Sequence, residues 1–512
     1  MTRRSRNLII AGLAVALVAT LGFYQLKGWA RFEEQVNRLA LDLGKPDGLI
    51  QTQALSRLPR DMLAVPMLKD VLSEDFVFYY EQNEDRLSLS GSLRRIAYEH
   101  DLQWQDKLLA WVLDEPAEIA VWRDGKGALA HYMIALSRNE LAKALYIRVG
   151  GDDVPVLALR YGRDRTLLLA SRGDRIVILS DPGMLLSEAN KADPAAEAIL
   201  VKLLSASAAD QHVLDKTFDL PAAAPTHRIA LSARYLSFGY QHFFPALAAV
   251  RFDFSDGQWT SAVRFAGKAG IAPEATARAL PARPAACAWL PMAWPDAETA
   301  AAAARPALPR LAGTVAACWY GQSELHMPLF VAELATDADA ASDKALADLF
   351  AWMVKGNDVE PESKRKDVAM WQRYTDGPYG PRSEDDQHYY LPTLARSKRM
   401  VVFSPDDRLV SQALDTLERR YPSVADSLPA ARERGTTLAV FTPTALASLT
   451  RKAVFATLPR AEEPTLHDAA QTHLLPRLKA LEKYPAFRLQ LPRGADATGW
   501  QSVDWQALPS QP

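Results

Sequence analysis

The chain has 512 residues, of which 49% are hydrophobic and 23% are charged. These are the proportions of a folded globular protein, so a disordered or fibrous chain is excluded, and the length predicts more than one domain. Lys and Arg number 59 against 61 Asp and Glu, which gives a net charge of −2 with no basic block beyond the N-terminus. A nucleic-acid-binding face is therefore not expected.

A basic segment at the N-terminus precedes a long uncharged run. Arg3, Arg4 and Arg6 are followed by residues 8–24, which carry no charged side chain. At about 1.5 Å per residue, a helix over this run would span roughly 26 Å, close to the thickness of the hydrocarbon core. We therefore expect residues 1–26 to form a single inner-membrane anchor, with the bulk of the chain in the periplasm. The competing interpretation is a cleaved signal peptide, although the run is long for one and no small-residue cleavage site follows it.

The exported part is expected to form two lobes of similar size. An Ala/Pro-rich stretch at 268–286 lacks hydrophobic periodicity, and its prolines prevent a long helix and stiffen the segment. We interpret it as the linker between a first lobe at 48–267 and a second lobe at 287–508. Residues 27–47 then form a juxtamembrane segment.

The two lobes resemble each other in sequence. RIVILSDPGMLLSEA at 175–189 aligns without a gap with RMVVFSPDDRLVSQA at 399–413, which places Val177 against Val401. Each segment is a short apolar run that ends at a serine or aspartate able to cap a helix. Two further pairs of segments match in the same order, namely 117–136 with 315–334 and 250–265 with 487–505. Alanine-rich strands can mimic one another, but the shared order predicts an internal duplication.

Each lobe is expected to be α+β with a mostly antiparallel sheet. The segments 117–136 and 250–265 are typical of hairpins, because apolar strands flank a glycine-containing turn in each. Amphipathic helices occur beside such hairpins rather than between every pair of strands. This arrangement favours an α+β fold over a doubly wound sheet.

The chain has two cysteines, Cys287 and Cys318, each in an expected short strand beside a tryptophan. A disulfide is chemically available to them in an oxidising compartment. The alternative is that both are small buried side chains that fill the core. Two thiols without a nearby histidine pair do not predict a metal site.

No catalytic motif is recognised in the sequence. It lacks the nucleophile-elbow, zinc-protease, phosphate-loop and dinucleotide-binding patterns. Ser363 and Lys366 fit the spacing S-x-x-K, but they lie in a fully charged stretch, where a solvated lysine stays protonated and cannot act as a base. We therefore expect no catalytic residues, no metal and no cofactor, and we favour a non-enzymatic protein.

The second lobe contains an insertion that the first lobe lacks. Arg160-Tyr161 and Arg373-Tyr374 mark equivalent positions, but the chain to the next matching strand is longer in the second lobe. The added residues fall at 375–390, where Gly-Pro pairs restrict the backbone. Long ordered loops often carry function, although many are only elaborated hairpin tips. The candidate binding residues are Asp376, Tyr379, Asp385, Asp386 and His388.

One N-terminal stretch carries a family resemblance. KPDGLIQTQALSRLPRDMLAVPMLKDVLSEDFVFYYE at 45–81, with GSLRRIAYEH at 91–100, resembles an uncharacterised family of bacterial membrane-anchored periplasmic proteins. Members of that family are often encoded beside bacterial alpha-2-macroglobulins. The resemblance implies a periplasmic location and a partnership with such a protein, and it carries over no catalytic residue.

The leading functional hypothesis is a non-catalytic accessory or scaffold protein. It would be anchored in the inner membrane through residues 8–24 and would bind another envelope protein. The alternative is a periplasmic hydrolase, or a protein that binds a small ligand or peptide, with its site between the lobes. A deep pocket that gathers acids and a histidine would favour the enzyme, whereas a broad surface patch would favour the scaffold.

Overall fold

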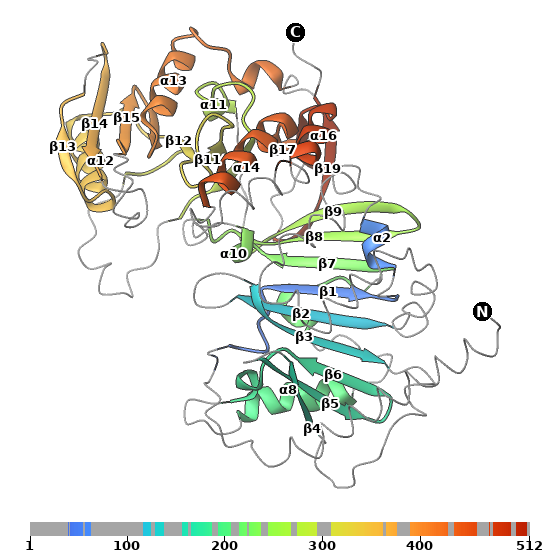
Figure 1. Ribbon diagram of the computed structural model, residues 1–512. Helices are drawn as coiled ribbons and strands as arrows, with labels where there is room; N and C mark the ends of the chain where they lie inside the picture. Colours follow the sequence, from blue (N-terminus) through green and yellow to red (C-terminus); the bar gives the residue numbers. More distant parts are fainter. Residues whose placement is uncertain are drawn as a thin grey trace. The chain divides into compact units, whose positions relative to one another are not determined.

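A computed structural model gives the arrangement of the chain (Figure 1). The residues that it describes are 39, 41–54, 57–62, 116–123, 129–137, 156–161, 165–186, 193–205, 214–222, 225–236, 244–267, 274–293, 309–361, 365–375, 390–428, 435–457, 471, 475–492 and 498–508.

The chain separates into two compact units. Unit 1 comprises Met1–Pro46 and Lys107–Thr217, and unit 2 comprises Asp47–Asp106 and Phe218–Pro512. The expected anchor at 1–26 lies outside the described residues. Among the residues that are described, no helix is long and apolar enough to cross a membrane.

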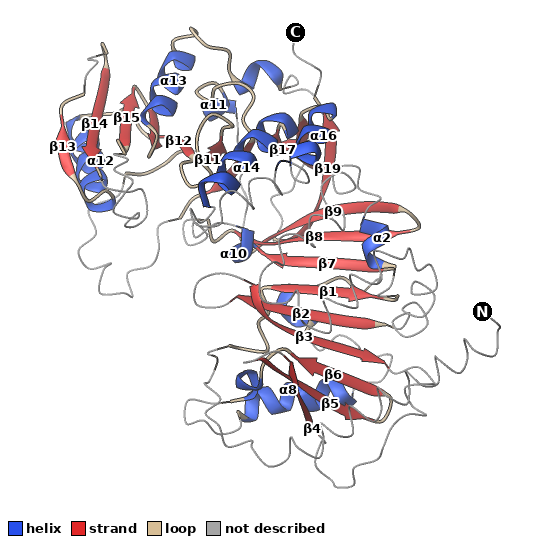
Figure 2. Ribbon diagram, in the orientation of Figure 1, coloured by secondary structure: helices blue, strands red, loops and turns tan. Residues whose placement is uncertain are grey.

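Unit 1 contains an antiparallel sheet with the strand order β2-β3-β6-β5-β4. Every second residue of β6 is buried, as expected of a strand with one face against a core. Helix α8 lies against β5 and β6 and buries Leu200, Leu203 and Leu204 (Figure 2). The elements are β2 (Ala117–Arg123), β3 (Leu129–Ser137), β4 (Val156–Tyr161), β5 (Arg165–Arg172), β6 (Arg175–Leu179), η2 (Pro182–Leu185) and α8 (Pro194–Ser205).

Unit 2 is built on one run of antiparallel pairings in the order β1-β7-β8-β9-β19-β18-β17-β10-β11-β12-β16-β15-β14-β13. Strand β19 joins the two parts of this sheet, because its residues 499–503 pair with β9 and its residues 504–507 pair with β18. The strands are β1 (Gly48–Thr52), β7 (His227–Ser232), β8 (Leu247–Ser255), β9 (Gln258–Phe265), β10 (Ala286–Pro291), β11 (Thr314–Trp319), β12 (Leu329–Glu333), β13 (Asn357–Val359), β14 (Val368–Tyr374), β15 (Thr393–Ser397), β16 (Met400–Ser404), β17 (Thr436–Phe441), β18 (Phe487–Leu491) and β19 (Gly499–Ala507).

Helices cover both faces of the C-terminal part of this sheet. Val402 of β16 packs with the apolar side of α13, whereas its neighbour Val401 packs with Leu346 and Phe350 of α12. Because successive strand residues point to opposite faces, the two helices lie on opposite sides of β16. The helices of unit 2 are α2 (Leu58–Met62), α10 (Ala233–Leu236), α11 (Glu274–Ala277), α12 (Ala340–Met353), α13 (Asp407–Leu417), η4 (Val424–Ser427), α14 (Pro443–Thr457), α16 (Leu475–Ala480) and η6 (Leu481–Lys483), and α9 (Asp215–Phe218) lies at the unit boundary.

The α+β class with a mostly antiparallel sheet is confirmed, since every pairing between the described strands is antiparallel within each unit. The division at 48–267 and 287–508 stays a prediction. The compact units divide the chain at other points, and β9 pairs with β19, so one sheet joins strands that we had assigned to different lobes.

The order and register of the strands nevertheless recur along the chain. The order β2-β3-β6-β5-β4 of unit 1 is repeated as β11-β12-β16-β15-β14 in unit 2. Val177 lies opposite Ala135 in the first set, and Val401 lies opposite Ala332 in the second. Within unit 2, β1-β7-β8-β9 is likewise repeated as β10-β17-β18-β19.

The described part of the expected linker is packed into the core of unit 2. Ala279 and Leu280 are fully buried in the same apolar cluster as Trp289. The Trp289 indole Nε1 donates a hydrogen bond to Thr276 Oγ1, 3.0 Å away, which ties α11 to β10. Small alanine side chains and one leucine bury this part of the segment although it lacks hydrophobic periodicity.

Candidate functional site

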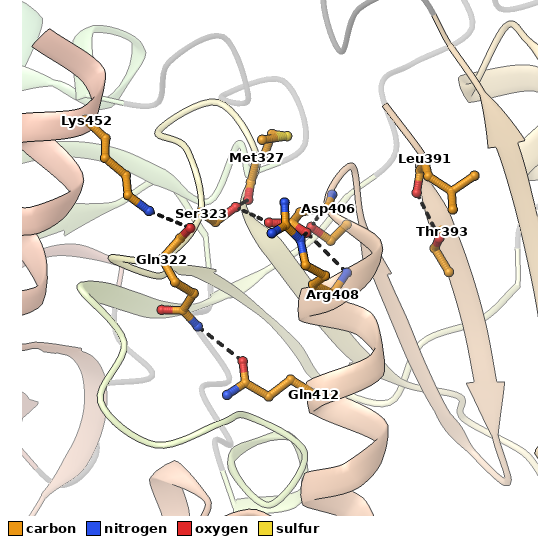
Figure 3. A network of polar contacts seen from close by, with 10 residues as sticks. Gln322, Ser323, Met327, Leu391, Thr393, Asp406, Arg408, Gln412 and Lys452 are labelled. Atoms are coloured by element: carbon orange, nitrogen blue, oxygen red, sulfur yellow. Dashed lines mark hydrogen bonds and ion pairs between the residues drawn. The ribbon is translucent and has the colours of Figure 1, made fainter. Parts of the chain in front are cut away.

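One end of the unit 2 sheet gathers several loops. The strand register places the C-terminal ends of β11, β14 and β16 beside the N-terminal ends of β12 and β15. The turn at 320–327, the first turn of α13 and the base of the 375–390 insertion therefore leave the sheet at the same end. We call the turn 320–327 and the adjoining first turn of α13 the polar rim (Figure 3).

Ser323 and Asp406 join the two parts of the polar rim below the surface. Ser323 Oγ donates a hydrogen bond to Asp406 Oδ2 over 2.8 Å, and both side chains are buried. The other carboxylate oxygen accepts from the backbone N of Arg408, 3.1 Å away, and so caps α13. Asp406 thus fixes both where the helix begins and where the turn lies.

Helix α14 holds the other side of the turn. A Cβ atom at Gly321 would lie only 2.9 Å from the backbone oxygen of Ala445, so the turn approaches α14 more closely than a side chain would allow. Ser448 Oγ donates to the Gly321 carbonyl over 3.2 Å. This close approach gives a physical reason for glycine at position 321.

The outer surface of the polar rim carries long polar side chains (Figure 3). Gln322 Nε2 donates to Gln412 Oε1 over 3.1 Å, and Lys452 Nζ donates to the Gln322 carbonyl over 2.6 Å. Arg408 is 87% exposed, and its Nε lies 3.4 Å from Asp406 Oδ1. Gln322, Arg408 and Lys452 are exposed, so a polar partner surface could reach them by exchanging these contacts.

The carboxylate next to the cap is electrostatically perturbed. Burial raises the pKa of Asp407, and the neighbouring Asp406 charge raises this pKa further, while Arg408 opposes both effects. The start of α13 therefore holds two adjacent acids, of which Asp406 is committed to hydrogen bonds inside the protein.

The insertion is closed at its base. The backbone N of Thr375 donates to the carbonyl of Tyr390, and the reverse bond has the same length of 3.1 Å. Both residues are buried. This pair of backbone hydrogen bonds therefore joins the end of β14 to the segment that leads into β15. The candidate residues Asp376, Tyr379, Asp385, Asp386 and His388 lie outside the described residues, so their role stays a prediction.

Cys287 and Cys318 face each other across β10 and β11 and are joined by a disulfide. Both are almost fully buried, and they belong to the same apolar cluster as Trp289 and Leu409. The cysteines therefore form a disulfide, and the bonded pair also fills part of the apolar core. The bond joins β11, which leads into the polar rim, to its neighbour β10.

A hydrogen-bonded chain elsewhere in unit 2 was not found from the sequence. Thr52 Oγ1 lies 2.7 Å from His227 Nδ1, and His227 Nε2 lies 2.7 Å from Asp61 Oδ2. If His227 is neutral and protonated on Nε2, Thr52 donates to the ring and the ring donates to Asp61. His227 lies 175 residues after Thr52 and 166 after Asp61, and the three belong to no common motif, so no sequence signal marked them.

Within the described residues, no group of three or more His, Cys, Asp or Glu side chains is placed to hold a metal ion. The polar rim offers surface hydrogen bonds and charge, and the Thr52–His227–Asp61 chain connects two buried side chains to a partly exposed carboxylate. The first arrangement suits recognition of a polar surface, and the second suits proton transfer.

Comparison with known proteins places the chain in a family. A family model described as "Uncharacterized protein conserved in bacteria (DUF2138)" matches residues 7–509. The chain belongs to this family. A relative from Escherichia coli (strain K12), "Uncharacterized protein YfaA", is 32% identical and is matched over 92% of each chain. The expectation of an uncharacterised bacterial family is thus confirmed, whereas the periplasmic location and the alpha-2-macroglobulin partner remain proposals.

One solved structure is also similar to part of the chain. The protein titled "Structure of crystal form I of TP0453" matches 47% of this chain and 82% of its own, with 8% identity and a TM-score of 0.19. A likeness at this level supports no inference about fold or function.

Proposed function

We propose that the protein is a non-catalytic binding protein of the periplasm, anchored in the inner membrane by residues 8–24. It would recognise another envelope protein, such as a bacterial alpha-2-macroglobulin, through the polar rim and the neighbouring insertion. The observation that carries the recognition role is the convergence of the turn 320–327, the start of α13 and the base of the insertion at one sheet end.

The disulfide supports the proposed compartment. Disulfides persist in the periplasm, whereas cytosolic thiols are kept reduced. Cys287 and Cys318 are joined inside the core of unit 2, where a bond has a structural rather than a catalytic place. A chain folded around such a bond fits an oxidising compartment.

The recurring strand order supports the insertion as a recognition element. Strands β14, β15 and β16 repeat the pairing of β4, β5 and β6, so the sheet core is complete without residues 376–389. The rung between Thr375 and Tyr390 already closes the hairpin below the insertion. Because the pairing of the described strands does not require these residues, we assign them to binding. We also propose that the recurrence reflects an internal duplication of the segments 48–267 and 287–508.

The proposed recognition is tested by affinity capture from membranes with the full-length tagged chain. Replacing residues 376–388 by a short Gly-Ser turn should leave the protein folded, because the cost of loop closure depends only weakly on length. The same replacement should abolish capture of the partner. A second variant, Arg408→Glu, reverses the charge of the exposed rim and should weaken capture without lowering the midpoint of thermal unfolding.

A matched control is Arg451→Glu, which reverses an exposed charge on α14. It should capture the partner as well as the natural chain does. If the loop replacement and Arg408→Glu both fold and both retain every captured protein, the rim is not the binding surface. The proposed function is then wrong.

A hydrolase is the second candidate, and the Thr52–His227–Asp61 chain is the observation that favours it. In such an enzyme Thr52 Oγ1 would attack an acyl carbonyl as its proton passes to His227 Nδ1, and Asp61 would stabilise the charged ring. The bond from the acyl carbon to the leaving group would then break as His227 returns the proton to that group, and water would hydrolyse the Thr52 ester. Thr52 is only 3% exposed, so a substrate would reach it only after this segment opens. The binding role therefore ranks first.

A fluorophosphonate probe separates these two functions. A reactive Thr52 would displace fluoride and form a phosphonate ester, detected by mass spectrometry of the intact chain. The binding role predicts no adduct on the natural protein. An adduct that disappears in Thr52→Val, with Thr437→Val as the matched buried-threonine control, would instead establish the hydrolase.

A further inference from the structure

Strands β7, β8, β9 and β19 lie side by side in unit 2 (Figure 1). Their register places three arginines in neighbouring positions on one face of this sheet. Arg251 of β8 lies opposite Ala230 on one side and Ala262 on the other, and Arg264 of β9 lies opposite Ala249. With Arg228 on β7, the arginines run diagonally across the sheet. The alanines between them have no bulk to separate the long side chains, so the guanidinium groups lie over the sheet.

A single aspartate forms ion pairs with two of these arginines. Asp253 Oδ1 accepts from Arg228 Nε over 2.8 Å, and Asp253 Oδ2 lies 3.0 Å from Arg251 Nε. Arg228 also donates through Nη1 to the Pro221 carbonyl, 2.9 Å away. Arg251 thus uses its Nε for the shared carboxylate and directs its outer amino groups elsewhere.

The outer end of Arg251 lies over Trp500. Its Cζ is 4.8 Å from the centre of the Trp500 ring, a cation–π distance, and its Nη1 is buried without a hydrogen-bond partner. The indole Nε1 of Trp500 donates to the carbonyls of Phe218 and Asp219 over 3.0 and 2.9 Å. The ring is therefore fixed by backbone, and it holds the guanidinium in place.

Trp500 also brings Arg251 beside Arg264. In strand register Trp500 lies directly opposite Arg264, so both arginines flank the same ring. The Asp219 carboxylate lies 3.9 Å from Arg264 Nη2 and is 75% exposed. An ion pair of this length in solvent is weak, so another anion could replace it.

Arg251 shares its ion-pair partner with a second arginine. Asp253 pairs with both Arg228 and Arg251. Burial lowers the pKa of Arg251, and the like charge of Arg228 lowers this pKa further, although Asp253 opposes both effects. An additional negative charge beside Arg251 would relieve this repulsion and satisfy its unpaired donor.

We propose that the side chains of Arg251, Arg264 and Trp500 form a binding site for an oxyanion, a carboxylate or a phosphate group. The anion accepts from Arg251 Nη1, displaces the Asp219 carboxylate from Arg264, and lies against the edge of the Trp500 ring. Planar guanidinium groups suit both kinds of oxyanion. This site lies on strands other than those that lead to the polar rim, and it does not depend on the proposed function.

The test is equilibrium dialysis of the full-length chain against inorganic phosphate, and separately against acetate, at constant ionic strength. We expect saturable binding of one of these anions. Arg251→Gln should weaken it at least about tenfold, because a charge-assisted bond is lost. Asp219→Asn should tighten it several-fold, because the competing carboxylate is gone. Arg234→Gln, an exposed arginine of α10, is the matched control and should leave the affinity unchanged.

Arg251→Gln and Asp219→Asn should change the anion affinity in opposite directions. If neither anion binds saturably to the natural chain at up to about 10 mM, the site does not exist at useful affinity. If Arg251→Gln binds the anion as tightly as the natural chain does, the assignment is also overturned. If Arg251→Gln fails to fold, as judged by circular dichroism, Asp219→Asn decides, and an unchanged affinity in that variant refutes the site. Saturation by phosphate but not acetate, or the reverse, identifies which oxyanion the site prefers.

Discussion

Individual arginines fasten the helices of unit 2 to its sheet. Arg396 of β15 donates through Nε and Nη2 to the two carboxylate oxygens of Asp343 in α12, over 2.5 and 2.8 Å. Arg365 donates to Asp415 of α13 over 2.8 Å. Such paired bonds have defined geometry, but they are partly exposed, so each fixes a helix orientation more than it adds stability. The helices on the two faces of the sheet are thus held by both polar and apolar contacts.

At the residue scale, Gly356 gives a sharp prediction. A Cβ atom at this position would overlap with the backbone carbonyl oxygen of Tyr374, which belongs to the sheet and is not free to move. Gly356→Ala should therefore lower the free energy of unfolding by about 1–3 kcal/mol, the usual cost of overpacking. Urea denaturation measures it.

Gly267→Ala is the matched control, because nothing lies within 4 Å of a Cβ atom there and its φ is not positive. It should change stability by less than about 0.5 kcal/mol, as most surface substitutions do. Equal stability of Gly356→Ala and the natural chain would show that the segment before β13 is not held against β14 as the structure has it.

At the scale of elements, strand-to-helix junctions recur with small changes. Asp181 caps η2 after β6, and Asp406 caps α13 after β16, with each carboxylate accepting from the backbone N two residues later. The first cap leads into one short 3-10 turn, whereas the second leads into a full amphipathic helix. The same local signal therefore starts helices of different length, because the residues that follow decide how far each one extends.

The second prediction concerns the junction between the turn 320–327 and α13. Asp406→Ala removes the cap and leaves the buried Ser323 hydroxyl without its acceptor, so it should cost about 2–4 kcal/mol. Ser323→Ala removes one hydrogen bond and should cost about 1 kcal/mol. The double variant should cost less than the sum, because the two side chains share one bond. Urea denaturation of all four proteins measures the coupling, and strict additivity would contradict the 2.8 Å contact.

The sequence predicted individual strands and helices better than it predicted which of them lie side by side. Short apolar runs marked the strands that became β6 and β16, and the cap residues marked the helix starts. Strand pairing was predicted within the hairpins at 117–136 and 250–265, which became β2–β3 and β8–β9. The Thr52–His227–Asp61 chain and the arginine face could not be predicted, because both arise when distant strands pair and bring together residues that share no motif.

At the scale of the whole molecule, β13, α12 and the base of the insertion all adjoin β14. Strand β13 pairs with β14, α12 contacts β14, and the backbone bonds between Thr375 and Tyr390 follow directly after β14. This clustering supports our proposal that recognition belongs to the C-terminal part of unit 2.

The third prediction links stability to compartment through the disulfide. Cys287 and Cys318 are 31 residues apart in sequence, so the bond restricts a loop of that length in the unfolded chain. On the chain-entropy account this restriction contributes about 3–4 kcal/mol to the free energy of unfolding. Reduction under denaturing conditions and refolding with dithiothreitol should lower the midpoint of urea denaturation by a corresponding amount. The double variant Cys287→Ser/Cys318→Ser has no disulfide to lose. Its urea midpoint should therefore be lower than that of the oxidised natural chain and should not change when dithiothreitol is added, which controls for other effects of the reductant.

The same bond reports where the chain folds in a bacterium. Protein that carries residues 1–26 should be recovered oxidised, because those residues would deliver the cysteines to the periplasm. A variant without residues 1–26 should be recovered reduced from the cytoplasm and should react with two equivalents of a maleimide reagent after denaturation. Gel shift after maleimide labelling distinguishes the two states. If the full-length chain is reduced in the cell, or the truncated chain is oxidised there, residues 1–26 do not determine the compartment and the periplasmic assignment fails.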